Sequence, residues 1–122
     1  MTFDYQLDNR GNYVAVTTSG NQNANQVEPY ILEIDKFCEA HGCNLVLLDE
    51  RGLSVHTDID HEVLLSDFVS FGHGLRHVSR IACVPSGQSR TTAIFFESLA
   101  RSKHFNFKVF DTIDAAMEWL EG

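Results

Sequence analysis

An apolar tetrapeptide that runs directly into three charged residues constrains the fold of this chain more than any other feature. Residues 45–48 are apolar and are followed by Asp49, Glu50 and Arg51, in the sequence LVLLDERG. A short apolar run between helical patterns is typical of a buried strand in a parallel sheet. The carboxylates would then lie at the carboxyl end of that strand, where α/β proteins bind ligands.

The rest of the chain repeats this alternation of strand and helix patterns. The hydrophobic periodicity predicts strands at 3–8, 12–18, 43–49, 78–84 and 105–110 and helices at about 27–41, 58–71, 92–102 and 113–120. The first two strands should form an antiparallel hairpin, because DNRG between them supplies turn residues. The order predicts a single α/β domain over residues 1–122, with a mostly parallel sheet, an N-terminal antiparallel hairpin and about four helices.

Residues at the expected helix ends support these boundaries. Asn25, with Glu28 three residues later, fits an N-terminal capping pair, and Pro29 is tolerated in the first turn of a helix. Gly42 fits the end of that helix. Asp111 or Thr112 would cap the last helix.

The composition indicates an ordinary globular protein with an uneven charge. The chain has 122 residues, 43% of them hydrophobic, and a net charge of −8. Residues 1–71 hold 3 basic and 12 acidic residues, whereas residues 72–122 hold 6 and 5. We expect no nucleic-acid binding from so acidic a chain. The start of the chain has no basic and apolar signal pattern and no apolar run approaches a membrane span, so we expect a cytoplasmic protein.

Three further stretches combine into a resemblance. They are GNYVAVTTSG in the hairpin, LVLLDERG after a helix that ends in glycine, and FFESLARSKHFNFKVFDTIDAAMEWL near the end of the chain. Together they resemble the SpoIIAA-like STAS family of small bacterial proteins, over nearly the whole chain. The resemblance implies a non-catalytic binding or regulatory module with a fold similar to anti-sigma factor antagonists and to lipid carriers of the CRAL-TRIO type.

The resemblance also locates a switch position. Anti-sigma antagonists carry LDLSGVxxxDSSGL after the same strand, and the first serine of DSSG is phosphorylated. An ungapped match on Asp49 and Gly52 places Asp58 at that serine. A Ser/Thr kinase cannot modify a carboxylate, and the nearby hydroxyls of Ser54 and Thr57 are out of register. Asp58 is also suited to capping a helix, so a phospho-regulated antagonist is the disfavoured alternative.

No stretch predicts catalysis or metal binding. Asp49 and Glu50 should point to opposite faces of a strand, and Arg51 would neutralise a neighbour. Cys38, His41 and Cys43 lack a fourth zinc ligand, and we interpret the cysteines as core residues. His73 and His77 are four residues apart, but Gly72 and Gly74 disfavour a continuous helix there and no glutamate completes an HExxH motif; the loop PSGQSRTT lacks the GxxxxGK[ST] pattern of a phosphate loop. We therefore predict no enzyme activity, no metal and no cofactor; a small uncharacterised enzyme is the second alternative.

An apolar cleft is the remaining candidate site. Phe68 and Phe71 precede the break FGHG, which could allow a helix to open, and basic residues follow from Arg76. Candidate contacts for an amphiphile with an anionic head are Phe68, Phe71, Leu75, Arg76 and Arg80. The sequence thus predicts a module that binds a protein partner or a lipid-like ligand, and it leaves open peripheral membrane contact and a homodimer.

Overall fold

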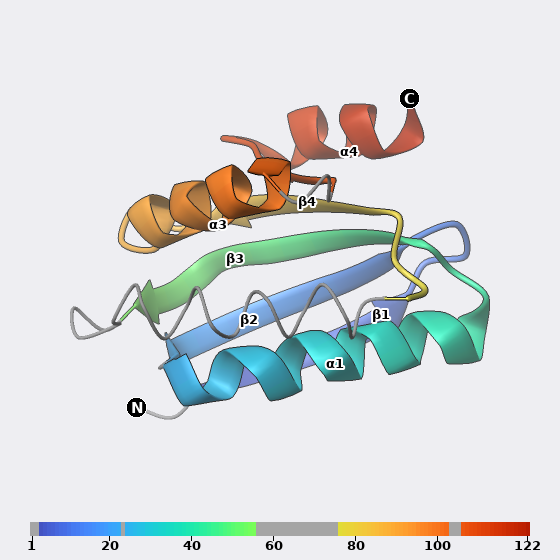
Figure 1. The fold of residues 1–122 in the computed structure, drawn as a ribbon, viewed down its shortest axis with the longest axis horizontal. Coiled ribbons are helices and arrows are strands. Elements are labelled where there is room, and N and C mark those ends of the chain that lie inside the picture. The colour runs from blue at the N-terminus through green and yellow to red at the C-terminus, as the bar shows by residue number, and fades with distance from the viewer. Residues whose placement is uncertain (1–2, 23, 56–75, 103–105) are drawn as a thin grey trace.

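The computed structural model describes residues 3–22, 24–55, 76–102 and 106–122, and the statements below concern these residues. Along the chain lie β1 (Asp4–Asn9), β2 (Val14–Gln22), α1 (Ala24–His41), β3 (Leu45–Val55), β4 (Arg80–Pro85), α3 (Arg90–Ser102), β5 (Phe107–Val109) and α4 (Ile113–Glu121) (Figure 1). The predicted helix at 58–71 lies outside the described residues. Among the helices described, none is long and apolar enough to span a bilayer.

The strands form one sheet in the order β1-β2-β3-β4-β5. β1 pairs with β2 in antiparallel fashion, whereas the other three pairs are parallel. The predicted α/β fold, a mostly parallel sheet with an N-terminal antiparallel hairpin, is therefore confirmed. β1 and β5 are the two edge strands of this sheet.

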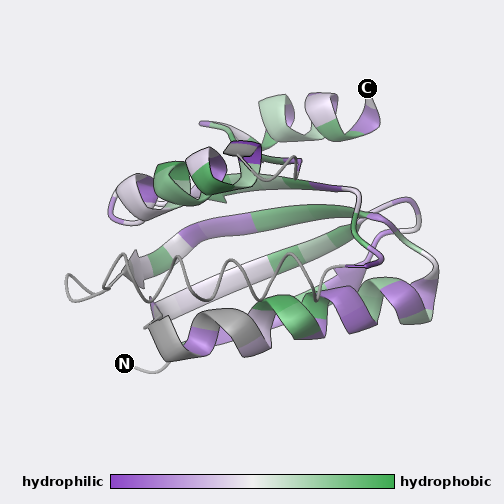
Figure 2. Cartoon of the chain, in the orientation of Figure 1, coloured by the Kyte–Doolittle hydropathy of each residue, from purple (hydrophilic) through white to green (hydrophobic). Residues whose placement is uncertain are grey.

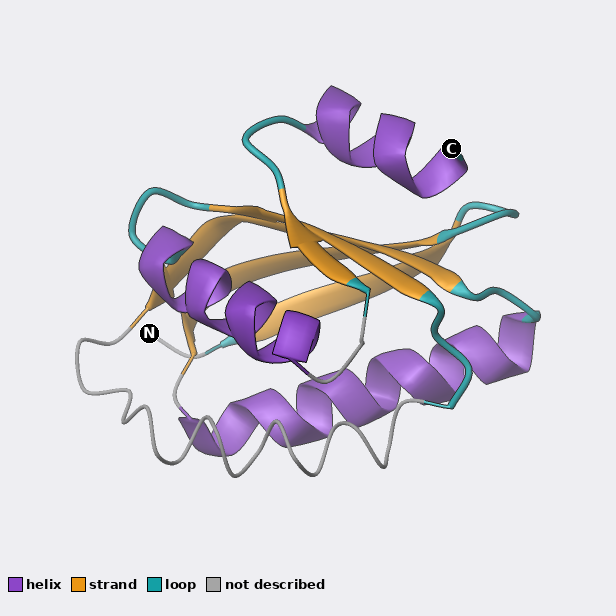
Figure 3. Ribbon diagram, turned by 45° about the horizontal axis from the view of Figure 1, so that its top comes forward, coloured by secondary structure: helices purple, strands orange, loops and turns teal. Residues whose placement is uncertain are grey.

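The helices cover both faces of the sheet (Figure 3). Alternate residues of β3 face opposite sides. Val46 and Leu48 pack with α1 and α3 in the larger core cluster, whereas Leu47 packs with α4 in the smaller one. β4 is buried on both faces, as expected of a parallel strand between helical layers.

The ends of the helices follow local rules, with one correction. Gly42 has a φ of +67° and ends α1, and the Cys43 N–H donates to the Cys38 carbonyl at 3.0 Å. Thr112 caps α4, because its hydroxyl accepts from the Ala115 N–H at 3.2 Å. The predicted start of α1 was wrong: the helix begins at Ala24, so Asn25 is not its N-cap and Pro29 lies inside the helix rather than in its first turn.

β3 is longer than predicted and contains an irregularity. We expected the strand to end at Asp49, but it continues to Val55. The pairing with β2 shifts between Thr17–Asp49 and Ser19–Gly52, so β3 contains one extra residue there. A Cβ at position 52 would lie 2.9 Å from the carbonyl oxygen of Thr18, which explains why glycine follows the bulge. The charged residues of LDERG therefore lie within the strand, where apolar colour gives way to polar colour in Figure 2.

Candidate functional site

The two neighbouring carboxylates of β3 lie in different environments. Asp49 forms a bidentate ion pair with the Arg51 guanidinium, with both N–O distances 2.8 Å. This pair lowers the pKa of Asp49 below its usual value. The predicted neutralisation by Arg51 is thus present, and Asp49 and Glu50 do not converge on one site.

Glu50 is turned toward α1 and is held by two buried side chains. Its carboxylate accepts from the Tyr30 hydroxyl at 3.3 Å and from the Cys83 thiol at 3.2 Å. Burial raises the pKa of Glu50, while these two hydrogen bonds act in the opposite direction. The result is an interior carboxylate that joins α1, β3 and β4.

The thiol in this cluster is poorly suited to nucleophilic chemistry. Cys83 is fully buried, and burial followed by the charge of Glu50 raises its pKa well above the usual value. The nucleophilic form of cysteine is the thiolate, which a neighbouring carboxylate disfavours. Cys38 is also buried, and burial raises its pKa to about 12. All three cysteines are free and buried, as predicted for core residues.

The serine residues of the loop after β4 form hydrogen bonds with each other and with the backbone of β3. The Ser86 N–H donates to the Glu50 carbonyl at 3.1 Å, so Ser86 continues the pairing where β4 ends. The Ser86 hydroxyl lies 2.5 Å from the Leu53 carbonyl oxygen and 2.9 Å from the hydroxyl of Ser89. Ser89 is 2% exposed and directly precedes α3. The hydroxyls of this loop therefore form hydrogen bonds with backbone groups of the protein itself.

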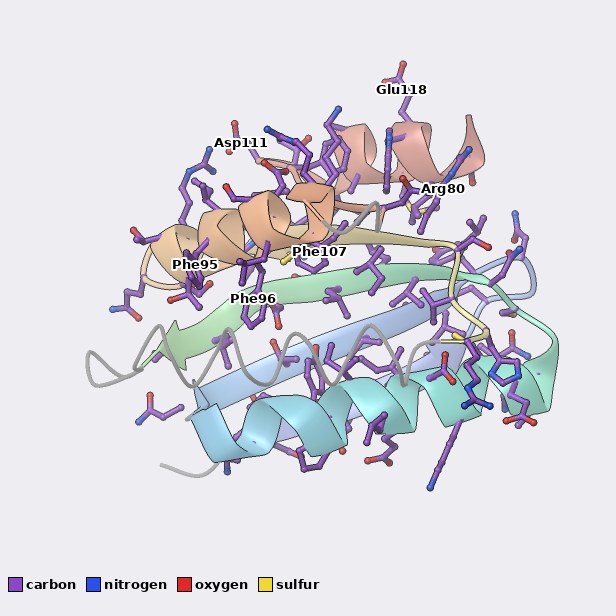
Figure 4. All side chains as sticks on the ribbon, viewed as in Figure 1. Arg80, Phe95, Phe96, Phe107, Asp111 and Glu118 are labelled. Atoms are coloured by element: carbon purple, nitrogen blue, oxygen red, sulfur yellow. The ribbon has the colours of Figure 1, made fainter. Side chains whose placement is uncertain are left out.

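Three arginines of the second half, Arg80, Arg90 and Arg101, have partners within the protein. Arg90 forms an ion pair with Asp111 near the start of α4. Arg80 donates to the carbonyls of Trp119 and Leu120 at 3.3 and 3.4 Å, at the other end of that helix (Figure 4). Arg101 lies 3.5 Å from Glu97. Each of these guanidinium groups therefore has a partner within the protein.

The residues predicted for ligand binding and switching are only partly described. Phe68, Phe71, Leu75, Thr57 and Asp58 lie outside the described residues. Arg76 is exposed, and Arg80 is a partner of α4 as above. Ser54 lies in β3, opposite Asn21 of β2, rather than in a loop. The cleft and the switch therefore stay predictions.

His77 has a structural partner in α1. Its N–H donates to Asp35 at 2.9 Å, and its Nδ1 lies 3.0 Å from the other carboxylate oxygen. Asp35 is 6% exposed, so the contact fixes the chain ahead of β4 against α1. The hydrogen bond to Asp35 raises the pKa of His77. Within the described part of the chain, no group of His, Cys, Asp and Glu side chains is placed to hold a metal ion.

The outer edge of β1 is the site feature that sequence reasoning missed. The Arg10 N–H donates to the Tyr13 carbonyl at 2.9 Å, which makes the residues with even numbers in β1 the ones that bond to β2. The backbone groups of Tyr5 and Leu7 therefore point away from the sheet. The Tyr5 N–H donates to the carboxylate of the preceding Asp4, at 2.9 Å.

The side chains of β1 divide into two sets. Tyr5 and Leu7 pack partly buried against the core on the α1 side. Asp4, Gln6 and Asp8 are exposed on the opposite face, where α4 packs on β3 and β4. β1 thus combines outward backbone groups with an acidic, exposed face. Alternation in FDYQLD was visible in the sequence, but the position of β1 at an edge depends on the strand order.

Comparisons with known proteins extend the picture of the fold. The sequence matches no protein-family model and no curated protein. Its structure is similar to an anti-sigma factor antagonist from Mycobacterium paratuberculosis, with a TM-score of 0.66 and 14% identity over 99% of this chain and 96% of that one. It is also similar to an uncharacterised protein from Shewanella loihica, with a TM-score of 0.58 and 17% identity over 97% and 93% of the two chains.

The second of these structures is described as having a SpoIIAA-like fold. Both similarities span nearly the full length of this chain, so they concern the arrangement of the whole sheet and its helices rather than a local motif. Together with the strand order and the antiparallel hairpin, they confirm the fold that the three sequence stretches predicted. The chain has the SpoIIAA-like STAS fold.

Proposed function

We propose that this protein is a non-catalytic module that binds a protein partner. The observation that carries the proposal is that both carboxylates of β3 are held by other side chains of the protein. Arg51 holds Asp49, and Tyr30 and Cys83 hold Glu50. An enzyme of this fold class would be expected to keep such groups available to a substrate.

The thiol–carboxylate pair gives the strongest argument against an enzyme. A catalytic cysteine needs a depressed pKa and access to solvent, and Cys83 has neither. The hydroxyls of Ser86 and Ser89 bond to each other, and Ser86 also lies against the Leu53 carbonyl, so within the described residues these hydroxyls bond to the protein itself rather than to a base. These contacts stabilise the interior of the fold, and binding would then take place at the protein surface.

The described role of one structural neighbour supports a protein partner. One structural neighbour is an anti-sigma factor antagonist, a protein that acts by binding another protein. The similarity supports the general mode of action and not the identity of the partner.

Partner isolation followed by reconstitution tests the proposal. The full chain would be immobilised, partners recovered from its source organism, and each candidate purified and titrated by calorimetry. We expect saturable binding of one protein at a fixed stoichiometry. A substrate turned over by the wild type, with turnover lost in both Cys83→Ala and Glu50→Gln variants that remain folded, would instead establish an enzyme.

A phospho-regulated antagonist is a second candidate, favoured by the same neighbour. Ser54 lies in a paired strand, and a paired backbone is a poor kinase substrate because it must first unpair. Asp58 cannot accept a phosphate from a Ser/Thr kinase. We expect no phosphate on Ser54 or Thr57 after incubation with an anti-sigma kinase and ATP. Stoichiometric phosphate at either residue, mapped by mass spectrometry, would favour the regulated antagonist.

The lipid-like ligand stays a prediction with a separate test. Arg80, one of its expected head-group contacts, is already bonded to the C-terminal carbonyls of α4. A fatty-acid titration at two salt concentrations would show saturable binding that weakens with salt and is lost in Arg76→Glu if the cleft exists. No binding at millimolar fatty acid would leave the protein partner as the surviving proposal.

A further inference from the structure

We infer that the outer edge of β1 is a docking site for an extended segment of a partner protein with basic residues at two positions four apart. This inference rests on the proposed function and specifies where a partner would bind and with which chemistry. The edge offers backbone donors and acceptors, and strand addition to such an edge is a common mode of peptide recognition.

The backbone of β1 presents the hydrogen-bonding groups that an added strand requires. Tyr5 and Leu7 direct their N–H and C=O groups outward, because Asp4, Gln6 and Asp8 bond to β2. The Asp4 carboxylate covers the Tyr5 N–H at 2.9 Å, but this contact is local and exposed. A partner cation could draw the carboxylate away and free that N–H for a partner carbonyl.

The side chains of β1 specify the partner's pattern. Residues opposite each other on paired strands interact, and opposite charges at such positions are favourable. Asp8, Gln6 and Asp4 would face a basic, a polar and a basic residue in turn. Leu7 and Tyr5, which pack on the α1 side, would face two apolar residues. The pattern is basic–apolar–polar–apolar–basic, and it reads the same in either strand direction.

The existing ion pair at this edge does not prevent such docking. Arg10 lies 2.9 Å from Asp8, and both side chains are more than half exposed, at 57% and 58%. Exposed ion pairs of this kind contribute about 0–1 kcal/mol, so a partner cation can replace Arg10 at little cost. The acidic first half of the chain would also attract a basic segment over longer distances.

The same pattern disfavours a second copy of this chain at the edge. Two β1 strands that pair antiparallel about Gln6 would bring Leu7 opposite Tyr5 of the other copy, which is the correct hydrogen-bonding register. The same register places Asp4 opposite Asp8 of the other copy, twice. Like charges directly opposite each other are destabilising. Pairing between the β1 strands of two copies is therefore disfavoured, and pairing with a basic segment is favoured.

A charge-swap titration tests the docking site. The probe is the capped peptide Ser-Lys-Val-Thr-Val-Lys-Ser, titrated into isotope-labelled full-length protein and followed by amide NMR; its control has glutamate in place of both lysines. We expect saturable shifts at Tyr5 and Leu7 with the lysine peptide. The double variant Asp4→Lys/Asp8→Lys should reverse the preference, with each mismatched pair binding about tenfold more weakly.

Backbone methylation separates strand pairing from charge attraction alone. In an antiparallel pair the valine N–H groups face β1 and the threonine N–H faces away, and in a parallel pair the reverse holds. N-methylation at the positions that face β1 should therefore abolish binding, whereas N-methylation at the other positions should have little effect. Equal effects of the two modifications, shifts located elsewhere, or no binding at millimolar peptide would overturn the inference.

Two further outcomes separate this inference from the proposed function. A purified natural partner that binds the wild type and Asp4→Lys/Asp8→Lys equally would overturn the edge site while leaving partner binding intact. The single variant Asp4→Lys places opposite charges across a β1–β1 pair, so it should self-associate in sedimentation experiments. Self-association of the wild type that the double variant loses would assign the edge to a second copy instead.

Discussion

At both edges of the sheet, a carboxylate accepts a hydrogen bond from a backbone N–H of the edge strand, but the two contacts have different consequences. On β5, the Val109 N–H donates to the Glu97 carboxylate of α3 at 2.6 Å, in a partly buried contact between two elements. On β1, the Tyr5 N–H donates to the carboxylate of the adjacent Asp4 at 2.9 Å, in an exposed contact within one strand. The first contact closes an edge through tertiary structure, whereas the second covers an edge only locally.

The lengths of the strands strengthen this contrast. β5 has three residues, and α3 packs beside it, so little of its backbone is available. β1 has six residues with a solvent-exposed face. Short, covered edges are a usual protection against unwanted pairing, and a longer open edge is where a partner strand can add. The comparison teaches that the protein closes one edge and keeps the other accessible.

The largest effect is expected from opening the closed edge. Glu97→Ala leaves the partly buried Val109 N–H without its acceptor and removes the contact with Arg101. An unsatisfied buried donor costs about 1–3 kcal/mol in the free energy of unfolding. Urea denaturation would measure the loss, and Glu97→Gln, which retains an acceptor oxygen, is the matched control. Equal losses in both variants would show that the hydrogen bond is not the cause.

Substitution of Glu50, which lies in β3 between the two edges, is expected to change the free energy of unfolding less than Glu97→Ala and to increase it rather than lower it. Burial raises its pKa, so ionisation is harder in the folded state than in the unfolded one. Its contribution to stability is therefore complete below about pH 4, where the carboxyl is neutral in both states, and is lost as the pH rises through the raised value. We expect Glu50→Gln to unfold like the wild type near pH 4 and to be more stable than the wild type at pH 8.

Thermal unfolding across that pH range would measure the Glu50 effect. Asp49→Asn is the control with the opposite sign, because Arg51 lowers the pKa of Asp49 and its contribution is lost as the pH falls. A Glu50→Gln variant whose stability relative to the wild type does not change with pH would contradict the proposed burial of this carboxylate.

The smallest effect is expected at the open edge. Asp4→Ala removes the carboxylate that covers the Tyr5 N–H, but water can replace it because the site is exposed. We expect a change in unfolding free energy within about 0.5 kcal/mol, as for most surface substitutions. Urea denaturation beside Glu97→Ala gives the comparison directly. A loss at Asp4 as large as that at Glu97 would show that the β1 edge is also a structural contact.

Local patterns in the sequence were enough to predict most of this architecture. Alternation of apolar and polar residues defined the hairpin, and helical periodicity ending at Gly42 defined α1, because both reflect burial of one face. The continuation of β3 past Asp49 was not predictable in the same way. Three successive charged residues resemble a strand end, and only the bulge and its pairing with β2 keep them within the sheet.

The candidate sites depended more on tertiary structure. Glu50 lies on the same face of β3 as Val46 and Leu48, but its partners Tyr30 and Cys83 lie 20 and 33 positions away in the sequence. The acidic face of β1 was visible in FDYQLD, yet an edge strand is defined by the order of strands, which depends on crossover connections rather than on local sequence.

Amide hydrogen exchange of the complex with the natural partner tests the central claim most directly. If the partner pairs with β1, exchange at the Tyr5 and Leu7 amides should slow by at least about tenfold on binding, because both N–H groups gain strand hydrogen bonds. Exchange at the Val109 amide, which Glu97 already protects, should not change. Unchanged exchange at both β1 amides in a saturated complex would contradict the account and place the partner on another surface.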